Sequence, residues 1–340
     1  MGGRFFMKYR VIILFFFLIL LSKNCIAGNE VVVYSSEDKI FSEPVLKAFE
    51  KKTGIAVRAI YDTEEAKSTG LLHRLLAEKE NPQADVFWCG DPVRPVLLEI
   101  KGVATPYYSP IAKEIPENYK DDGGHWTRFS ARARVILYNT DLVSMDEKPL
   151  SIFDLVKPEW RNNVAIANPL FGTTAIHMAA LFIVLGDEEA KKFLNDLKRN
   201  GVKVVSSNGE VKRLVSRGEV KAGITDTDDA NVAIQDNYPL KIVFPDKDGI
   251  GTLIMPNTVC LIKNGPNLEN GKKLIDYLLS REVEKKLAWD ICAQMPLRYD
   301  VEAPAHVFSI NAITGMNVDY HNVAKKMEEI HGFLKQWAGF

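Results

Sequence analysis

The sequence predicts an α/β fold of two lobes, built on mainly parallel sheets with helices on their faces. Three observations lead to this prediction. Short apolar runs of strand length alternate with amphipathic segments along most of the chain, which is the pattern of βαβ units. The chain of 340 residues is long enough for two domains of ordinary size. No internal repeat and no low-complexity linker divides it, so we expect the two lobes to be interleaved.

The first 27 residues have the layout of a cleavable secretory signal peptide. A positively charged start is followed by the apolar run Val11–Leu21, which is too short to span a bilayer comfortably. We expect cleavage after Ala27 and a periplasmic protein. Two alternatives stay open: the run could persist as a membrane anchor, or Cys25 could be lipidated, although Lys23 makes a poor lipidation motif.

The charge of the chain argues against nucleic acid as a partner. Residues 1–27 carry four basic residues and no acidic ones, so their removal changes the formal net charge from −1 to −5. A chain with this acidic balance has no basic excess for binding DNA or RNA.

Three cysteines follow the signal segment, and none sits at metal-ligand spacing. Cys89 and Cys260 lie in strand-like apolar runs, where a buried small hydrophobic residue is the usual role. An odd number leaves at least one thiol free or paired between chains. A disulfide between Cys260 and Cys292 stays open as an alternative.

The N-terminal half of the chain alternates strands with helices. Val31–Tyr34 is a short apolar run that ends at serines, which is typical of a buried strand. Residues 42–52 have helical apolar spacing and stop at Gly54, a residue type that often ends helices. Further strands are expected at 56–61, 84–88 and 134–138, and further helices at 70–80, 92–101 and 152–156.

The C-terminal half continues this pattern. Strands are expected at 164–167, 202–205, 222–224 and 259–262, and helices at 175–185, 188–199, 208–217, 271–279, 282–287 and 318–337. Residues 225–229 are rich in Thr and Asp, and we expect them to form a loop after the strand at 222–224.

An ordered series of short motifs resembles a known family. The motifs are VVVYSS at 31–36, FEKKTGI at 49–55, ADVFW at 84–88, SARARV at 130–135, NGEV at 208–211 and GEVKAGI at 218–224. In this order and at these separations they resemble the periplasmic substrate-binding proteins of ABC importers, and most of all the ferric-iron-binding group. The resemblance covers nearly the whole mature chain.

This resemblance implies a type II periplasmic-binding fold. In that fold two α/β lobes, each a mixed, mainly parallel sheet flanked by helices, are joined by two crossing hinge strands around a ligand cleft. We place the crossings near residues 132–139 and 248–260. The expected boundaries are 28–131 plus 249–304 for the first lobe, 132–248 for the second lobe, and 305–340 for a C-terminal helical segment that packs on the second lobe.

Polar loops follow the predicted strands, and ligands of open α/β sheets bind where strands end. At Gly172-Thr173-Thr174, small residues open a helix, so backbone N–H groups can approach an oxyanion; a plain helix cap is the alternative. Arg132 could clamp an anion, whereas arginines such as Arg134 are often structural in the resembled family. The candidate ligand-binding residues are Ser35, Ser36, Thr63, Asp91, Arg132, Gly172, Thr173, Thr174, Asn208 and Thr227.

The metal ligands of the ferric group are not matched in this chain. That group holds iron largely through tyrosine oxygens, commonly a Tyr-Tyr pair in the second lobe. The matching segment here, residues 225–229, has three aspartates and no tyrosine. Carboxylates are hard oxygen ligands for a hard cation, but they could instead cap helices or pair with Arg94. The candidate metal ligands are Asp38, Asp91, Asp226 and Asp228.

The leading functional hypothesis is a monomeric binding protein that captures ferric iron or a similar hard ion, with an anion completing the shell, and delivers it to an inner-membrane ABC permease. The alternative cargo is a small organic anion or zwitterion, such as a phosphate ester or an aminophosphonate. We expect no cofactor and no enzyme, because the sequence lacks the GxSxG, HExxH and P-loop motifs. His125, in a Gly-Gly-His-Trp loop, has no partner that the sequence identifies.

Overall fold

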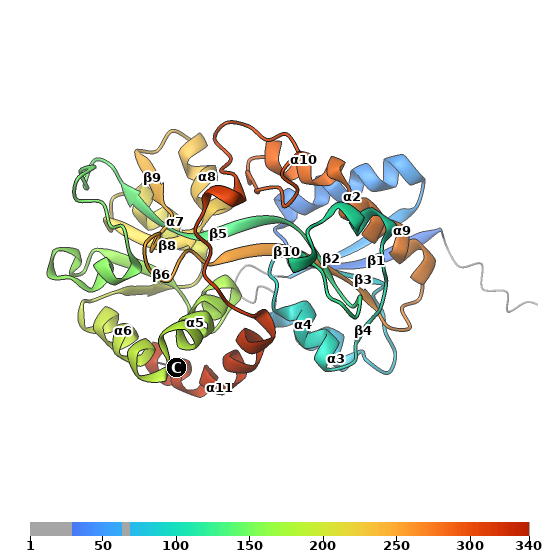
Figure 1. The fold of residues 1–340 in the computed structure, drawn as a ribbon, viewed down its shortest axis with the longest axis horizontal. Helices are drawn as coiled ribbons and strands as arrows, with labels where there is room; N and C mark the ends of the chain where they lie inside the picture. Colours follow the sequence, from blue (N-terminus) through green and yellow to red (C-terminus); the bar gives the residue numbers. More distant parts are fainter. Residues whose placement is uncertain (1–28, 63–68, 340) are drawn as a thin grey trace, which may run out of the picture.

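The computed structural model describes residues 29–62 and 69–339. The predicted signal peptide at 1–27 and the candidate ligand residue Thr63 lie outside these ranges. Figure 1 shows two lobes side by side, with two long strands running between them. Within the described ranges, no helix combines the length and the apolar character needed to cross a membrane.

The first lobe is an α/β unit with a mixed sheet. Its strands are β1 (Glu30–Ser35), β2 (Ala56–Tyr61), β3 (Val86–Cys89), β4 (Ala104–Thr105) and most of β10 (Ile254–Ile262). β1 lies between β2 and β3 and is parallel to both, and β10 lies antiparallel to β3. Its helices are α2 (Lys39–Thr53), α3 (Thr69–Ala77), α4 (Arg94–Ile100), α9 (Leu268–Leu278) and α10 (Arg281–Trp289). α2 ends at Gly54 in a left-handed conformation, with its N–H donating to the carbonyl of Glu50.

The second lobe repeats the same construction. Its strands are β6 (Val164–Ala167), β7 (Lys203–Val205), β8 (Ala222–Asp226) and β9 (Leu240–Val243). β6 lies between β7 and β8 and is parallel to both. Its helices are α5 (Gly172–Leu185), α6 (Asp187–Arg199), α7 (Asn208–Ser216) and α8 (Thr227–Gln235).

One long strand, β5 (Thr127–Asn139), belongs to the sheets of both lobes. Its first half pairs antiparallel with β10, and its second half pairs antiparallel with β8 and β9. Every residue of β5 is buried. A register shift between Pro256 and Asn257 interrupts the β5–β10 pairing, and Ser130 on β5 has a φ of 42° at this point, as expected of a β-bulge.

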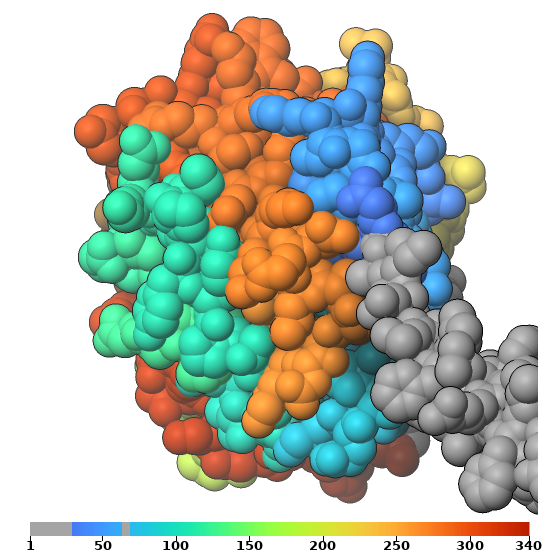
Figure 2. All heavy atoms as spheres, turned by 90° about the vertical axis from the view of Figure 1, so that its right-hand side faces the viewer, coloured from blue at the N-terminus to red at the C-terminus, as the bar shows by residue number. Residues whose placement is uncertain are grey.

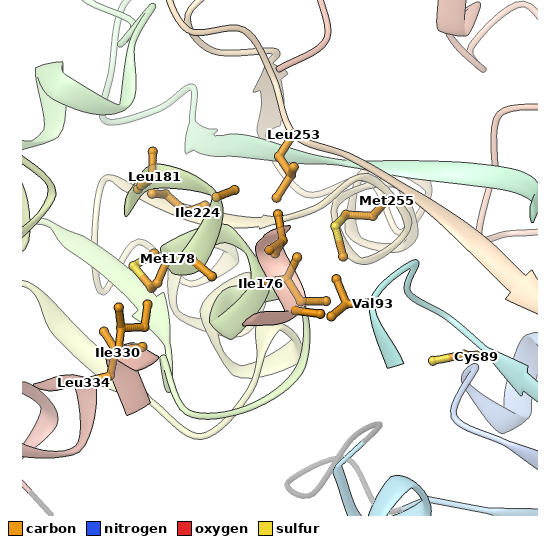
Figure 3. Close-up of a cluster of buried hydrophobic side chains, with 14 of the residues drawn as sticks. Cys89, Val93, Ile176, Met178, Leu181, Ile224, Leu253, Met255, Ile330 and Leu334 are labelled. Carbon is orange, nitrogen blue, oxygen red and sulfur yellow. The ribbon is translucent and has the colours of Figure 1, made fainter. Parts of the chain in front are cut away.

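The hydrophobic core is continuous between the lobes. Figure 3 shows Ile176 of α5 lying close to Val93, which precedes α4, with Met255 of β10 beside them. Burial of these side chains stabilises the packing of α4 and α5, because each one removes apolar surface from water.

The C-terminal helix, α11 (Tyr320–Ala338), contacts both lobes. It packs against α5 of the second lobe and also against α4 of the first. Its end is fixed to α6, where the Trp337 indole donates to the carbonyl of Leu194 at 3.0 Å. The sequence prediction had placed this segment on the second lobe only, so the contact with α4 is an addition to it.

Segments distant in the sequence also meet on the outer face of the first lobe. Figure 2 shows this face, where the early part of the chain lies beside the segment that carries α9 and α10. α2 contacts both of these helices, so this face of the first lobe is formed by segments far apart in the sequence.

The α/β fold class predicted from the sequence is confirmed, but the loop expected at residues 225–229 is wrong. Thr225 and Asp226 complete β8, and α8 begins at Thr227 without an intervening loop. Asp228 and Asp229 fall in the first turn of α8, where negative side chains are stabilised by the positive end of the helix dipole.

Glu284 on α10 stabilises the β-bulge of β5 at Ser130. Its carboxylate is fully buried and accepts hydrogen bonds from Arg298 Nη1 at 2.7 Å, from Leu297 N at 2.8 Å and from Ser130 N at 3.3 Å. We predict that Glu284→Ala lowers the free energy of unfolding by about 3–5 kcal/mol, because it leaves the buried Arg298 without its ion-pair partner. Urea unfolding followed by circular dichroism measures this change.

The matched control is Glu282→Ala on the same helix. Glu282 pairs with Lys52, and both side chains are more than half exposed, so this variant should lose less than about 1 kcal/mol. Equal losses in the two variants would contradict the role assigned to Glu284.

Candidate functional site

A cavity lies between the lobes, where several strands end. Its volume is about 30 Å³. Ser36 and Gly90 contribute from the first lobe, and the remaining wall comes from β5 and the second lobe. The lining residues are Ser36, Gly90, Arg132, Ala167, Asn168, Phe171, Gly172, Thr173, Thr174, Ser206, Ser207, Asn208 and Asp226. Among the residues that the structure describes, no tyrosine lines this cavity.

Two helices begin at the cavity wall. α5 starts at Gly172, and its N-cap residue, Phe171, makes no side-chain capping bond. α7 starts after Ser207, whose hydroxyl accepts from Glu210 N at 3.1 Å. The first N–H groups of a helix have no partner within the helix, and they carry partial positive charge. Both helix starts therefore favour an anion in the cavity.

Glycine is required at the start of α5. Gly172 has a φ of 55°, in the left-handed region that side-chain-bearing residues rarely adopt. A Cβ atom at this position would meet no heavy atom within 4 Å. The constraint is therefore the backbone conformation that turns the chain into the helix, and not lack of space.

Arg134 of β5 forms hydrogen bonds to several side chains in the part of the cavity wall that the second lobe provides. Its fully buried guanidinium donates from Nη1 to Asp226 Oδ1 at 2.8 Å and to Thr173 Oγ1 and Asn208 Oδ1, both at 3.0 Å. Nη2 donates to Thr174 Oγ1 at 3.2 Å. The second oxygen of Asp226 accepts from the Thr173 hydroxyl at 2.7 Å and from Asn208 Nδ2 at 3.0 Å.

These contacts fix the charge of Asp226. Burial by itself would raise the pKa of Asp226, but Arg134 and Arg132 outweigh it, so the pKa is lowered. The carboxylate therefore stays ionised at neutral pH. Because it already accepts bonds from Arg134, Thr173 and Asn208, its main role in this structure is to tie the first turn of α5 to β5.

Arg132, two residues earlier on the same face of β5, joins the two lobes. Its Nη2 donates to Glu37 Oε2 at 2.6 Å and to the carbonyl of Gly90 at 2.7 Å, and its Nη1 forms an ion pair with Asp228. Burial would lower the pKa of Arg132, whereas Asp228 and Glu37 raise it, and the pKa lies well above its ordinary value. The buried Nε of Arg132 has no hydrogen-bond partner in the described part of the chain.

A chain of buried polar groups anchors Glu37 in the first lobe. Gln294 Nε2 donates to Glu37 Oε1 at 3.1 Å, and Asn257 Nδ2 donates to Gln294 Oε1 at 2.6 Å. The Trp88 indole donates to Asn257 Oδ1 at 3.0 Å. The position of Arg132 is therefore fixed through this chain to the centre of the first sheet.

Asp91 caps α4 and is not part of the cavity wall. Its Oδ1 accepts from Val93 N at 2.9 Å and from Arg94 N at 3.0 Å, while Cys89 Sγ contacts its Oδ2 at 3.2 Å. Arg94 Nη1 lies 3.4 Å from Asp91 Oδ2 and also donates to the carbonyl of Gly172 at 3.4 Å. This last bond joins α4 of the first lobe to the start of α5, so the cleft is closed in this structure.

Most of the residues singled out from the sequence meet at the cavity. Ser36, Arg132, Gly172, Thr173, Thr174 and Asn208 line it, as does Asp226 from the set of candidate metal ligands. Ser35, Asp91 and Thr227 do not line it. The Ser35 hydroxyl donates to the carbonyl of Glu37 at 3.4 Å, and Thr227 Oγ1 accepts from Ala133 N at 3.2 Å.

The remaining acids gather beside Arg132. Ligand oxygens of Glu37, Asp38 and Asp228 lie within 4.8 Å of one another, and those of Asp226, Asp228 and Asp229 form a second such group. Both groups are next to the cavity and include carboxylates paired with Arg132 or Arg134. Of the predicted metal ligands, Asp228 belongs to both groups, Asp38 only to the first and Asp226 only to the second, and Asp91 is in neither.

The sequence reading missed part of the wall. Ala167, Ser206 and Ser207 were not singled out, although all three line the cavity. Ser207 and Glu210 have the spacing of a helix start, and this signal would have placed Ser206 and Ser207 beside the other helix openings. The cysteines that follow the signal segment are buried, and Cys260 and Cys292 are not joined by the disulfide that the sequence left open.

Comparison with known proteins identifies the family. The family of bacterial extracellular solute-binding proteins matches residues 84–311. The chain belongs to this family. It is 29% identical over 291 residues to "Iron uptake protein A1" of Synechocystis sp., covering 80% of this chain and 79% of that protein. It is 28% identical over 284 residues to a "Putative 2-aminoethylphosphonate-binding periplasmic protein" of Salmonella typhimurium, covering 81% of each.

Solved structures agree with the fold. Apo ferric ion-binding protein A of Pasteurella haemolytica has a TM-score of 0.81 and 27% sequence identity, with 91% of this chain and 98% of that chain covered. The resemblance to periplasmic binding proteins with a type II fold, stated from the motifs, is therefore confirmed for this extracellular solute-binding protein.

His177 of α5 makes the stability of the closed site depend on pH. Its ring is fully buried, and burial together with Arg134 lowers its pKa to about 3. Because the unfolded state takes up a proton below the ordinary histidine pKa of about 6.5 while the folded state does not, folding stability falls as pH falls from about 6.5 toward 3. We predict that, between pH 6 and pH 5, the wild type loses about 1 kcal/mol more than His177→Gln.

Urea unfolding at the two pH values measures this difference. His331→Gln, at an exposed position on α11, is the control and should keep the wild-type slope. A His177→Gln variant with the same pH dependence as the wild type would contradict the burial effect.

Proposed function

We propose that this solute-binding protein captures a small ligand with a tetrahedral oxyanion head, a phosphate ester or a phosphonate, in the cavity between its lobes. The observation that carries the proposal is the convergence of two helix starts, those of α5 and α7, on one cavity that Thr173, Thr174 and Arg132 also line. Backbone N–H groups at helix starts bind oxyanions without any net positive charge from side chains.

The relative from Salmonella typhimurium carries aminoethylphosphonate in its name, and this class of molecule has the oxyanion head that the cavity favours.

Ferric iron with a bound anion is a second candidate cargo. The observation in its favour is the two groups of carboxylates beside the cavity, which are hard oxygen donors. The relative from Synechocystis sp. is named an iron uptake protein. In this candidate one of the two groups, Glu37-Asp38-Asp228 or Asp226-Asp228-Asp229, would hold the ion, and the anion would bind at the start of α5.

Delivery follows from closure of the lobes. A ligand that contacts both walls favours the closed state in proportion to its extra contacts there. The bond from Arg94 to Gly172 joins the lobes in that state. We expect the protein to act as a monomer in the periplasm, to leave its ligand chemically unchanged, and to present the closed form to an inner-membrane ABC permease. The lobe boundaries at residues 131 and 249 stay predictions.

A ligand panel tests the cargo. We predict that the protein purified after export is stabilised against thermal unfolding by 2-aminoethylphosphonate or by a sugar phosphate, because binding to the folded state alone stabilises it by about 2.7 kcal/mol at a hundredfold excess over Kd. Differential scanning fluorimetry with ferric citrate, citrate and inorganic phosphate as parallel samples measures this. A shift with ferric citrate alone would overturn the oxyanion proposal and favour the iron candidate.

A substitution in the cavity wall tests where the ligand binds. Thr174→Val keeps the shape of the side chain and removes the hydroxyl of a residue that is 1% exposed and lines the cavity. We predict an affinity at least tenfold weaker for the ligand found in the panel, or about 1.4 kcal/mol, measured by calorimetry. Thr105→Val in β4 of the first lobe is the matched control. Unchanged affinity in Thr174→Val would place the oxyanion elsewhere.

A further inference from the structure

A third group of side chains that could hold a metal ion lies away from the cavity, at the junction of α4 and α11. Glu99 is near the end of α4, Asp121 and His125 come from the loop before β5, and His321 is in the first turn of α11. One ligand atom each of Glu99, Asp121 and His125 lie within 4.8 Å of one another. His321 Nε2 lies 3.3 Å from Glu99 Oε2.

The spacing of these atoms fits a small tetrahedral ion. Zinc bonds to nitrogen and oxygen at about 2.0–2.1 Å, which places neighbouring ligand atoms about 3.3 Å apart. His125 Nδ1 and Asp121 Oδ2 are 2.9 Å apart, and the pair between His321 and Glu99 is 3.3 Å apart. Glu99 belongs both to the group with Asp121 and His125 and to the pair with His321, so it links the two pairs.

The surroundings hold the ligands in place. Glu99 Oε2 accepts from the Trp126 indole at 2.8 Å, which is the kind of supporting bond that orients a ligating carboxylate. A Cβ at Gly123 would lie 2.9 Å from His125 Nδ1 and 3.0 Å from Asp121 Oδ2, so the absence of a side chain there lets the two groups meet.

The group is reachable from solvent. The side chains of Asp121, Glu99, His125 and His321 are 11%, 21%, 28% and 36% exposed, in that order. An ion can therefore enter, and its four ligands would still be shielded on the protein side. Two imidazoles and two carboxylates are a donor set suited to zinc and similar divalent ions of the first transition row.

We propose that Glu99, Asp121, His125 and His321 form a binding site for a divalent transition-metal ion of the zinc class, separate from the ligand cleft. The ion joins the start of α11 to the first lobe. The end of α11 is held by the second lobe through Lys198, whose ammonium donates to the carbonyl of Trp337 at 2.6 Å. The site thus completes a connection along α11 between the lobes.

Zinc titration of the exported, chelator-treated protein tests this site. We expect calorimetry to show one zinc ion per chain, with at least tenfold weaker binding in His125→Gln and in His321→Gln. His331→Gln on the same helix and Asp228→Asn in the cleft should keep the wild-type affinity. The melting temperatures of all variants without metal report whether each one folds.

Cobalt provides a second readout that depends on the ligands themselves. Co²⁺ bound by two imidazoles and two carboxylates absorbs visible light, and this absorption should change in His125→Gln and His321→Gln but not in His331→Gln. No zinc binding by the wild type, or zinc binding that is lost in Asp228→Asn and retained in both histidine variants, would overturn the proposal.

Discussion

The ion pairs of β5 are the constraint on which the rest of the site depends. Arg132 and Arg134 are two residues apart on one strand, so they point to the same face, and that strand belongs to both sheets. Arg132 joins Glu37 of the first lobe to Asp228 of the second, and Arg134 ties Asp226 to the start of α5. Loss of one partner would leave a buried charge unpaired, at a cost of about 3–5 kcal/mol. The crossing between the lobes and the wall of the cavity are therefore held by the same interactions.

The elements that the sequence predicted well are those with a strong local signal. The strands at 56–61 and 164–167 have the predicted bounds. Each was predicted from an apolar run with polar residues at its ends, and this signal lies in residues adjacent along the chain. The helix closed by Gly54 also ends where expected. α8 was missed because its first turn is rich in Thr and Asp; these residues are common in loops and equally suited to a helix start.

The candidate site was predicted in its location and less well in its roles. Ser36 follows β1 and the segment from Gly172 to Thr174 follows β6, so each could be placed at the strand ends of its own lobe, and the resemblance to a two-lobed binding fold placed both at the cleft. Asp91 had the same kind of position but serves as a cap for α4. The pairing of Arg132 with Glu37 joins residues 95 positions apart, and no local pattern in a single sequence identifies such a contact.

The arginine pairs also bear on the two candidate cargoes. Glu37, Asp226 and Asp228 carry three negative charges against the two of Arg132 and Arg134, so net charge alone would favour a cation. A cation held by Asp226 or Asp228, however, would compete with the guanidinium already bound there, and the displaced arginine would remain buried. An oxyanion meets no such competition at the starts of α5 and α7, because in the residues that the structure describes those carboxylates accept no bond from the first backbone N–H groups of either helix. The pairing within the protein thus reverses the preference that the bare count of charges suggests.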